Sequence, residues 1–244
     1  MVEAVVTTSW DDGHPCDLRL AELLRAYDVP ATFYVPVYND ERARMSPRQV
    51  REIARDFDVG GHSLHHVDLR RIPLAEAGKE IVEGKKVLED MVGRELRCFC
   101  YPWGSFNDHI ANIVRGAGFL GARTTKSLTR RMGEPFAMTA TANATNWWFA
   151  PYVRHSLAAR DLKFFIFMLR NNLLCRGWHR LATETLDFVV RNGGIWHLWG
   201  HSWEIDQNND WGVLEELFRE IGALPGEVRR LTNSQLLETL AGGG

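Results

Sequence analysis

The stretch Ser9-Trp10-Asp11-Asp12-Gly13-His14 follows five residues, Ala4-Val5-Val6-Thr7-Thr8, that are typical of a buried strand. Its two carboxylates stand side by side at the end of that strand, where burial is costly unless something compensates their charge. A cation is the simplest compensation, and one carboxylate could bind it while its neighbour stays free for proton transfer. On these residues alone, an ordinary turn with a positive φ at Gly13 is favoured over a cation site.

The length and composition of the chain favour one globular domain spanning residues 1–244. The chain has a hydrophobic fraction of 45% and an aromatic fraction of 11%, which are enough for a real core. Its 29 basic and 31 acidic side chains give a net charge of -2. This balance argues against a protein that binds nucleic acid or a membrane surface.

The distribution of apolar residues predicts no membrane span. No basic region followed by an apolar core stands near Met1, which favours a cytoplasmic protein. The four cysteines do not resemble a disulfide framework in a chain of this length. Cys98 and Cys100 lie two apart in an apolar strand, so we expect them to share a face in the core. The oligomeric state is not indicated.

Predicted strands alternate with predicted helices along the chain. The strands are expected at residues 4–8, 31–37, 57–59, 98–101, 120–123, 138–142 and 195–199. The helices are expected at residues 17–26, 46–55, 74–92, 107–117, 160–171, 179–191, 213–221 and 233–240. This alternation predicts a parallel sheet, and a closed or nearly closed (β/α) barrel is the leading candidate. In such barrels the chemistry lies in loops at the C-terminal ends of the strands.

A second polar cluster, Gly60-Gly61-His62-Ser63-Leu64-His65-His66, follows the third predicted strand. On a helical turn, His62 and His66 would lie on one face, close enough to share a metal ion, while His65 would point elsewhere. Together with Asp12 they form a set of two imidazoles and one carboxylate, as in catalytic zinc sites. The same set could hold other divalent transition metals, and ordinary surface histidines are the alternative.

Two further clusters follow predicted strands. Tyr101-Pro102-Trp103-Gly104 leaves its strand through a turn that is either an aromatic lid or a source of backbone N–H groups for an oxyanion. His201 follows the strand at 195–199, where it could act as a general acid. His197 lies within that strand, which favours a hydrogen-bonded structural histidine.

These clusters together resemble the motifs of the NodB-type polysaccharide deacetylases, carbohydrate esterase family 4, over most of the chain and in the expected order. Ser9-Trp10-Asp11-Asp12-Gly13 is similar to the first motif, usually Thr-Phe-Asp-Asp-Gly. The stretch from Val59 to His66 is similar to the metal-histidine motif. His201-Ser202-Trp203-Glu204 is similar to the His-Pro-Trp-Glu version of the last motif. The resemblance implies a distorted (β/α)7 barrel.

The resemblance also implies roles for individual residues. It makes Asp11 the general base and His201 the general acid, with the backbone amide of Trp103 helping to bind the oxyanion. It makes Asp12, His62 and His66 ligands of a divalent metal, with Zn²⁺ favoured and Co²⁺, Ni²⁺ or Mn²⁺ as alternatives.

The implied activity is metal-dependent removal of an N-acetyl or related acyl group from an amino-sugar poly- or oligosaccharide. One alternative is a deacylase of a small or lipid-linked amidated sugar or of a non-sugar amide. A second alternative is an inactive carbohydrate-binding module.

The chain departs from the family pattern at Cys100. Many members carry an arginine there, two residues before the proline of the third motif, where it orients the catalytic aspartate. Another residue must orient Asp11, and the sequence does not name it.

Aromatic residues near the predicted chemistry are candidates for sugar contacts. These candidates are Tyr101, Pro102, Trp103, Trp199 and Trp203, with Trp147 and Trp148 as further candidates for lining the site. Trp178, Trp196 and Trp211 are predicted to be core or interface residues. Glu204 and Asp206 are predicted to be solvated loop acids.

Overall fold

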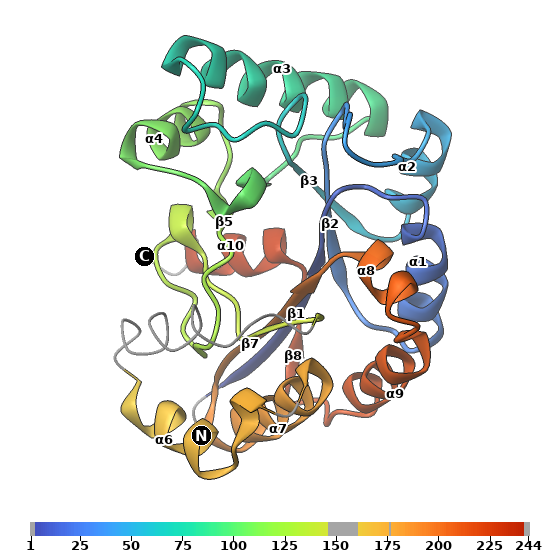
Figure 1. Ribbon diagram of the computed structural model, residues 1–244, viewed down its shortest axis with the longest axis vertical. Coiled ribbons are helices and arrows are strands. Elements are labelled where there is room, and N and C mark those ends of the chain that lie inside the picture. Colours follow the sequence, from blue (N-terminus) through green and yellow to red (C-terminus); the bar gives the residue numbers. More distant parts are fainter. Residues whose placement is uncertain (1–2, 146–160, 176, 242–244) are drawn as a thin grey trace.

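A computed structural model describes residues 3–145, 161–175 and 177–241. Its centre is a sheet in which all the recorded strand pairs are parallel, in the order β5-β4-β3-β2-β1-β7-β6, with β8 paired to β1. The strands are β1 (Ala4–Trp10), β2 (Ala31–Val35), β3 (Asp58–Gly61), β4 (Cys98–Cys100), β5 (Gly121–Arg123), β6 (Ala142–Asn143), β7 (Gly194–Gly200) and β8 (Arg229–Arg230). The sheet curls and carries helices around its outside, which is a distorted (β/α)7 barrel (Figure 1).

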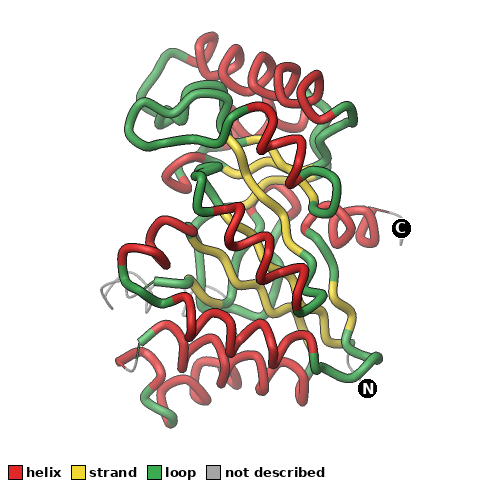
Figure 2. The backbone as a smooth tube through the Cα atoms, turned by 90° about the vertical axis from the view of Figure 1, so that its right-hand side faces the viewer, coloured by secondary structure: helices red, strands yellow, loops and turns green. Residues whose placement is uncertain are grey.

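The helices cover the strands on both sides in the turned view (Figure 2). They are α1 (Asp17–Ala26), α2 (Pro47–Ile53), α3 (Leu74–Val92), α4 (Asp108–Gly116), α6 (Leu162–Arg170), α7 (Trp178–Asn192), α8 (Ser202–Gln207), α9 (Trp211–Gly222) and α10 (Asn233–Ala241). Short 3-10 helices are η1 (Pro102–Gly104), η2 (Pro135–Ala137) and η3 (Leu173–Cys175). No described helix is both long and apolar enough to cross a membrane.

Most predicted elements are confirmed, with α1 and α3 at their predicted bounds. The sequence analysis missed α8 and β8. The strand predicted at 138–142 is wrong for most of its length, because β6 covers only Ala142–Asn143. The preceding residues instead hydrogen-bond to the loop at 124–132, for example from Thr139 N to Met132 O at 2.7 Å.

Strand β1 is the centre of the sheet. It pairs with β7 over its whole length, from Ala4 opposite Gly194 to Trp10 opposite Gly200. Its other edge is shared, with β2 alongside residues 8–10 and β8 alongside residues 5–6. Because the neighbours are parallel, the residues that follow β1, β3, β4 and β7 emerge at the same edge of the sheet.

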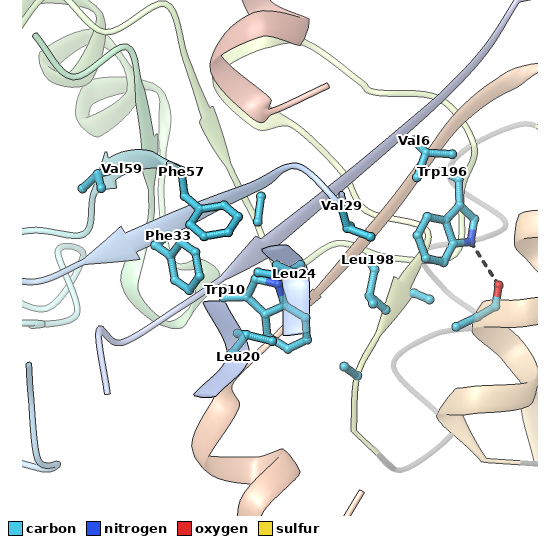
Figure 3. Close-up of a cluster of buried hydrophobic side chains, with 14 of the residues drawn as sticks. Val6, Trp10, Leu20, Leu24, Val29, Phe33, Phe57, Val59, Trp196 and Leu198 are labelled. Carbon is cyan, nitrogen blue, oxygen red and sulfur yellow. Dashed lines mark hydrogen bonds between the residues drawn. The ribbon is translucent and has the colours of Figure 1, made fainter. Parts of the chain in front are cut away.

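Two apolar clusters fill the protein. The larger lies between the sheet and the helices, where Trp10 of β1 packs among Leu20, Leu24 and Phe33 (Figure 3). The smaller includes Val5, Tyr34, Cys98, Cys100 and Met138, together with residues of α10. Cys98 and Cys100 are therefore buried core residues, as predicted.

Polar contacts fasten α10 to the strands. The buried Asn233 side chain accepts from Thr7 Oγ1 at 2.8 Å and donates to the Tyr34 hydroxyl at 2.9 Å. Ser234 Oγ donates at 2.8 Å to the carboxylate of Asp58, the first residue of β3. The last helix thus seals the N-terminal end of the strands and leaves the other end open for the loops.

Candidate active site

Asp11 and Asp12 follow β1 directly and are both almost fully buried. The Asp11 N–H donates to Gly200 O at 3.0 Å, which continues the pairing of β1 with β7 beyond the strand. Asp12 has a φ of 76°, in the left-handed region. The backbone therefore turns sharply between the two carboxylates, and each faces a different set of side chains.

The Asp12 carboxylate meets two imidazoles. Its Oδ1 lies 3.2 Å from His66 Nε2 and 3.7 Å from His62 Nε2. One ligand atom from each residue lies within 4.8 Å of the other two. Ligands about 2.0–2.2 Å from one zinc ion have this kind of separation. The three residues therefore form a candidate metal site.

The hydrogen bonding of His62 suits metal binding. Its Nδ1 lies 2.8 Å from Cys100 O, and a carbonyl can only accept, so Nδ1 carries the proton. This leaves the lone pair on Nε2, the nitrogen that faces Asp12. A backbone carbonyl on the far nitrogen is a usual partner of a metal-binding histidine. The donor set and its tautomer fit a divalent cation.

The prediction that His62 and His66 share a helical turn is wrong. They lie in a loop after β3 whose backbone is left-handed at Ser63 and His66. In this loop, Leu64 O accepts a hydrogen bond of 2.7 Å from Tyr38 N. The two rings nevertheless come together, with centroids 4.9 Å apart. His65 points elsewhere, as expected, because its Nδ1 lies 2.7 Å from Glu80 Oε1.

Backbone strain concentrates at these loops. Of the eight non-glycine residues with positive φ in the described part of the chain, four are Asp12, Ser63, His66 and Trp103. Each such residue costs of order 1–3 kcal/mol and persists only where the surroundings hold it in place. The strain marks this edge of the sheet as the candidate functional site.

The electrostatics around Asp12 favour its anion. Burial alone would raise its pKa, but the neighbouring imidazoles of His62 and His66 outweigh that effect and hold the pKa of Asp12 well below its usual range. Trp203 Nε1 donates to Asp12 Oδ2 at 2.9 Å. One oxygen of Asp12 thus faces the imidazoles, and the other is held by an indole.

Arg123, the last residue of β5, is positioned to orient Asp11, the role that Cys100 cannot fill. Its fully buried guanidinium pairs with Asp11 Oδ2, and its Nη2 also lies 2.9 Å from Cys100 Sγ. Burial works against the charged guanidinium, but the nearby Asp11 charge raises the pKa of Arg123. The Asp11 Oδ1 atom is buried without a hydrogen-bond partner among the described residues.

Sequence reasoning missed Arg123, although a signal was present. Burying a charge is costly unless it is paired, and Gly121-Ala122-Arg123 places a cation at the end of a short predicted strand. That end is the edge at which the other polar clusters emerge. The separation of 112 residues from Asp11 concealed the pair.

His201 follows β7 and is oriented by Glu204. Its Nδ1 donates to Glu204 Oε2 at 2.6 Å, and its Nε2 lies 3.9 Å from Asp12 Oδ2. Burial would lower the pKa of His201, but the Glu204 hydrogen bond and the Asp12 charge raise it overall. The prediction that Glu204 is a solvated loop acid is wrong, because α8 folds its side chain back onto the histidine.

His197 is a buried structural residue, as predicted. Its Nδ1 donates to Thr139 O at 3.3 Å, so its Nε2 accepts from Ser9 Oγ at 2.8 Å. Burial and the nearby Arg123 charge lower the pKa of His197 to about 3. The ring is therefore neutral and takes no part in proton transfer near neutral pH.

The predicted aromatic candidates differ in their exposure. Trp103 is 59% exposed, whereas Trp199 and Tyr101 line the pocket but are buried. Pro102 is also buried. Trp203 has Arg42 over one face, with the guanidinium carbon 3.4 Å from the ring centroid. Trp103 is thus the open indole of the predicted set.

The remaining tryptophans were predicted either to be core or interface residues or to line the site. Trp178, Trp196 and Trp211 are buried, as expected. The suggested Trp147 and Trp148 lie outside the described residues.

Trp103 lies in a short turn that lines the pocket. Trp103 is the second residue of η1, so its N–H has no carbonyl partner within that turn. Trp103 has a φ of 60°, and the next residue, Gly104, packs so closely that an added Cβ would lie 2.2 Å from Thr125 Oγ1. A free N–H on a fixed turn is the arrangement that an oxyanion site requires.

These residues enclose a pocket of about 170 Å³ lined by Asp11, Asp12, His62, His66, Trp103, His201 and seven neighbours that include Arg42 and Glu204. A shallower groove of about 640 Å³ adjoins it. The pocket and the groove share Glu41, His66 and Trp103. The site is therefore a small pocket that opens sideways into a groove.

Comparison with known proteins places this arrangement in a family. The model of the polysaccharide deacetylase family matches residues 2–122. A peptidoglycan-N-acetylglucosamine deacetylase from Bacillus cereus is 26% identical over 120 residues, which cover 48% of this chain and 54% of the relative. The peptidoglycan-N-acetylmuramic acid deacetylase PdaC from Bacillus subtilis is 27% identical over 116 residues, covering 46% and 24% respectively. The chain thus spans about half the length, or less, of these curated relatives.

Solved structures extend the likeness of the fold to nearly the whole chain. A Mycobacterium smegmatis protein described as a polysaccharide deacetylase superposes with a TM-score of 0.70 at 18% identity, covering 98% of this chain and 91% of the other. A family 4 carbohydrate esterase from Streptomyces lividans superposes with a TM-score of 0.55 at 14% identity, covering 91% of each chain. The residues from 123 onward that complete the pocket lie beyond the matched family model. The family model over residues 2–122 places the chain in the polysaccharide deacetylase family, and the solved structures show that the fold is shared over nearly the whole chain.

Proposed function

We propose that this protein is a divalent-metal-dependent deacetylase that removes the N-acetyl group from amino-sugar units of a poly- or oligosaccharide. The observation that carries the proposal is the convergence on one pocket of Asp11, with one unpartnered oxygen, and the Asp12, His62 and His66 set. His201 lies on the other side of Asp12. A carbohydrate-binding module would need neither a general base nor a general acid.

The proposed mechanism assigns a step to each side chain. Asp12, His62 and His66 would hold a divalent cation, with Zn²⁺ favoured, which would supply polarisation of the amide carbonyl and activation of water. Asp11 Oδ1 accepts the proton of the attacking water, while Arg123 holds the other oxygen. The Trp103 N–H donates to the oxyanion that forms, a contact of the kind worth about 3 kcal/mol.

The remaining step is the departure of the amine. His201, protonated and steered by Glu204, donates its Nε2 proton to the sugar nitrogen. The carbon–nitrogen bond then breaks and releases acetate and the free amino sugar. Without this proton the leaving group would be an amide anion, so the intermediate would revert to substrate.

The adjoining groove favours an oligomeric substrate over a small one. Trp103 stands exposed between the pocket and the groove, so its indole offers a flat apolar surface to a sugar next to the one being deacetylated. A site for a small or lipid-linked amide would have no use for an open groove. A small-substrate deacylase is the second candidate.

The test is acetate release from N-acetylated substrates of different length. Metal-depleted protein supplied with Zn²⁺, Co²⁺, Ni²⁺ or Mn²⁺ is incubated with the monosaccharide, short oligosaccharides and polymer. The proposal expects metal-dependent release that increases from monosaccharide to oligosaccharide. Release from the monosaccharide alone would favour the second candidate, and no release with any metal would favour the binding module.

A further inference from the structure

The two oxygens of the Asp12 carboxylate face different groups. Oδ1 lies 3.2 Å from His66 Nε2 and 3.7 Å from His62 Nε2. Oδ2 accepts a hydrogen bond from Trp203 Nε1 at 2.9 Å and lies 3.9 Å from Arg42 Nε. Because Oδ2 is already engaged by an N–H donor, a cation bound by the two imidazoles meets Oδ1.

Trp203 comes from the short helix α8, which begins directly after His201. The next residue in this helix, Glu204, binds the His201 ring through Nδ1 at 2.6 Å. The Trp203 ring lies against the same imidazole, with ring centroids 5.1 Å apart. Helix α8 therefore carries two neighbouring side chains that hold residues of the site, Glu204 on His201 and Trp203 on Asp12.

The indole of Trp203 is itself held by the loop that follows β2. The guanidinium carbon of Arg42 lies 3.4 Å from the centroid of the Trp203 ring. Both ends of the loop are anchored, because Asn39 Oδ1 accepts from Arg42 N at 3.2 Å and Met45 N donates to Gly13 O at 2.7 Å. The guanidinium is thus fixed against the indole by the backbone next to Asp12.

The charge of Arg42 acts on the same carboxylate oxygen as the indole. Its ion pair is with Asp12 Oδ2. Glu41 lines the same pocket, but among the residues that the structure describes no ion pair joins it to Arg42. Arg42 therefore attracts Oδ2 and packs on the indole that binds Oδ2, so both of its contacts favour one orientation of the Asp12 carboxylate.

We propose that Trp203 is a positioning residue of the metal site, whose N–H holds Asp12 Oδ2 so that Asp12 binds the cation through Oδ1 alone. Arg42 stabilises the indole in this position. The inference rests on the metal site of the proposed function. Hydrogen-bond partners of this kind fix the orientation of a ligand before the metal binds, and their loss typically lowers metal affinity.

The test is the Zn²⁺ affinity of metal-depleted protein, measured by competition with a chromophoric chelator. Trp203→Phe removes the N–H and keeps an aromatic ring beneath Arg42, whereas Arg42→Gln removes the cation and keeps the N–H. Trp211→Phe is the matched control. Trp211 Nε1 also donates to a carboxylate, Asp206 at 2.9 Å, and it also has an arginine, Arg19, stacked at 4.4 Å, but it lies outside the pocket.

We expect Trp203→Phe to raise the Kd for Zn²⁺ about 10- to 100-fold. Arg42→Gln should raise it less, because the hydrogen bond to Oδ2 remains, and Trp211→Phe should leave it unchanged. A wild-type Kd in Trp203→Phe would overturn the proposal. A larger effect of Arg42→Gln than of Trp203→Phe would also overturn it, because the charge and not the indole would then hold the carboxylate.

A second background separates positioning of Asp12 from general packing. In Asp12→Ala, which lacks the carboxylate, the further change Trp203→Phe should have little effect on the Kd for Zn²⁺. Circular dichroism of each variant controls for folding. The same factor in both backgrounds would contradict the inference, because Trp203 would then support the site without acting through Asp12.

These measurements contain no sugar, so they are independent of acetate release. A wild type that binds none of Zn²⁺, Co²⁺, Ni²⁺ and Mn²⁺ would contradict the proposed metal site and this inference together. A wild type that binds Zn²⁺ with the same affinity as Trp203→Phe would contradict this inference alone.

Discussion

The pairing of Asp11 with Arg123 shows how a side chain can be supplied from a different strand. Cys100 stands where the family resemblance led us to expect the orienting arginine, and β5 lies beside β4 in the sheet with Cys100 opposite Arg123. The guanidinium therefore reaches the same aspartate from the next strand. Cys100 contributes a small thiol that leaves room for this arginine.

Replacing Arg123 should impair Asp11 as a base. Without the cation, the buried carboxylate binds a proton more readily. In Arg123→Gln we expect turnover to fall about 100-fold, a loss typical of misplaced catalytic groups. The acid limb of the pH–rate profile should also move to higher pH.

Arg123→Lys keeps the charge and should retain more activity than the glutamine variant. Circular dichroism and metal content control for folding, since breaking a buried ion pair is itself destabilising. If both variants keep the wild-type pH profile, Arg123 does not act through Asp11.

Glu204 should set the basic limb of the same profile. The Glu204 carboxylate raises the pKa of His201, and a general acid works only while protonated. In Glu204→Gln the pKa of His201 falls, so activity should be lost at lower pH than in wild type. Glu216→Gln, at an exposed position of α9, is the control. An unchanged basic limb in Glu204→Gln would assign the limb to another group.

At the scale of elements, β1 and β7 share a buried histidine that makes stability depend on pH. The pKa of His197 is about 3 in the folded protein and about 6.5 when exposed. The unfolded chain therefore binds the proton first, and stability falls as the pH falls below 6.5. The loss between pH 7 and pH 5 is about 2 kcal/mol from this residue alone.

Urea unfolding between pH 7 and pH 5 measures this dependence. His197→Gln should be less stable at pH 7, because it loses the contacts to Ser9 and Thr139, but its stability should depend less on pH. His109→Gln, on the exposed face of α4, should retain the wild-type slope. A wild-type slope in His197→Gln would contradict the assignment of a neutral buried ring.

For the whole molecule, the sequence analysis predicted features built from residues close together in the chain. It missed contacts between residues that are far apart in the chain. The strand-and-loop motifs carry their periodicity and their ligands within a few residues, so the barrel and the Asp12, His62 and His66 set could be predicted. Arg123 reaches its partner through the strand order of the sheet, which no local pattern encodes. The loop geometry at His62 and His66 was also beyond reach, because its backbone depends on pairing with the chain after β2.

In the proposed active site, Asp12, His62 and His66 hold the metal while Asp11 moves the proton. Metal content and acetate release, measured on the same preparations of wild type, Asp11→Asn and His62→Ala, test it most directly. We expect about one metal per chain in wild type, the same content in Asp11→Asn with turnover reduced at least about 100-fold, and loss of both in His62→Ala. Near-normal turnover in Asp11→Asn, or full metal content in His62→Ala, would contradict it.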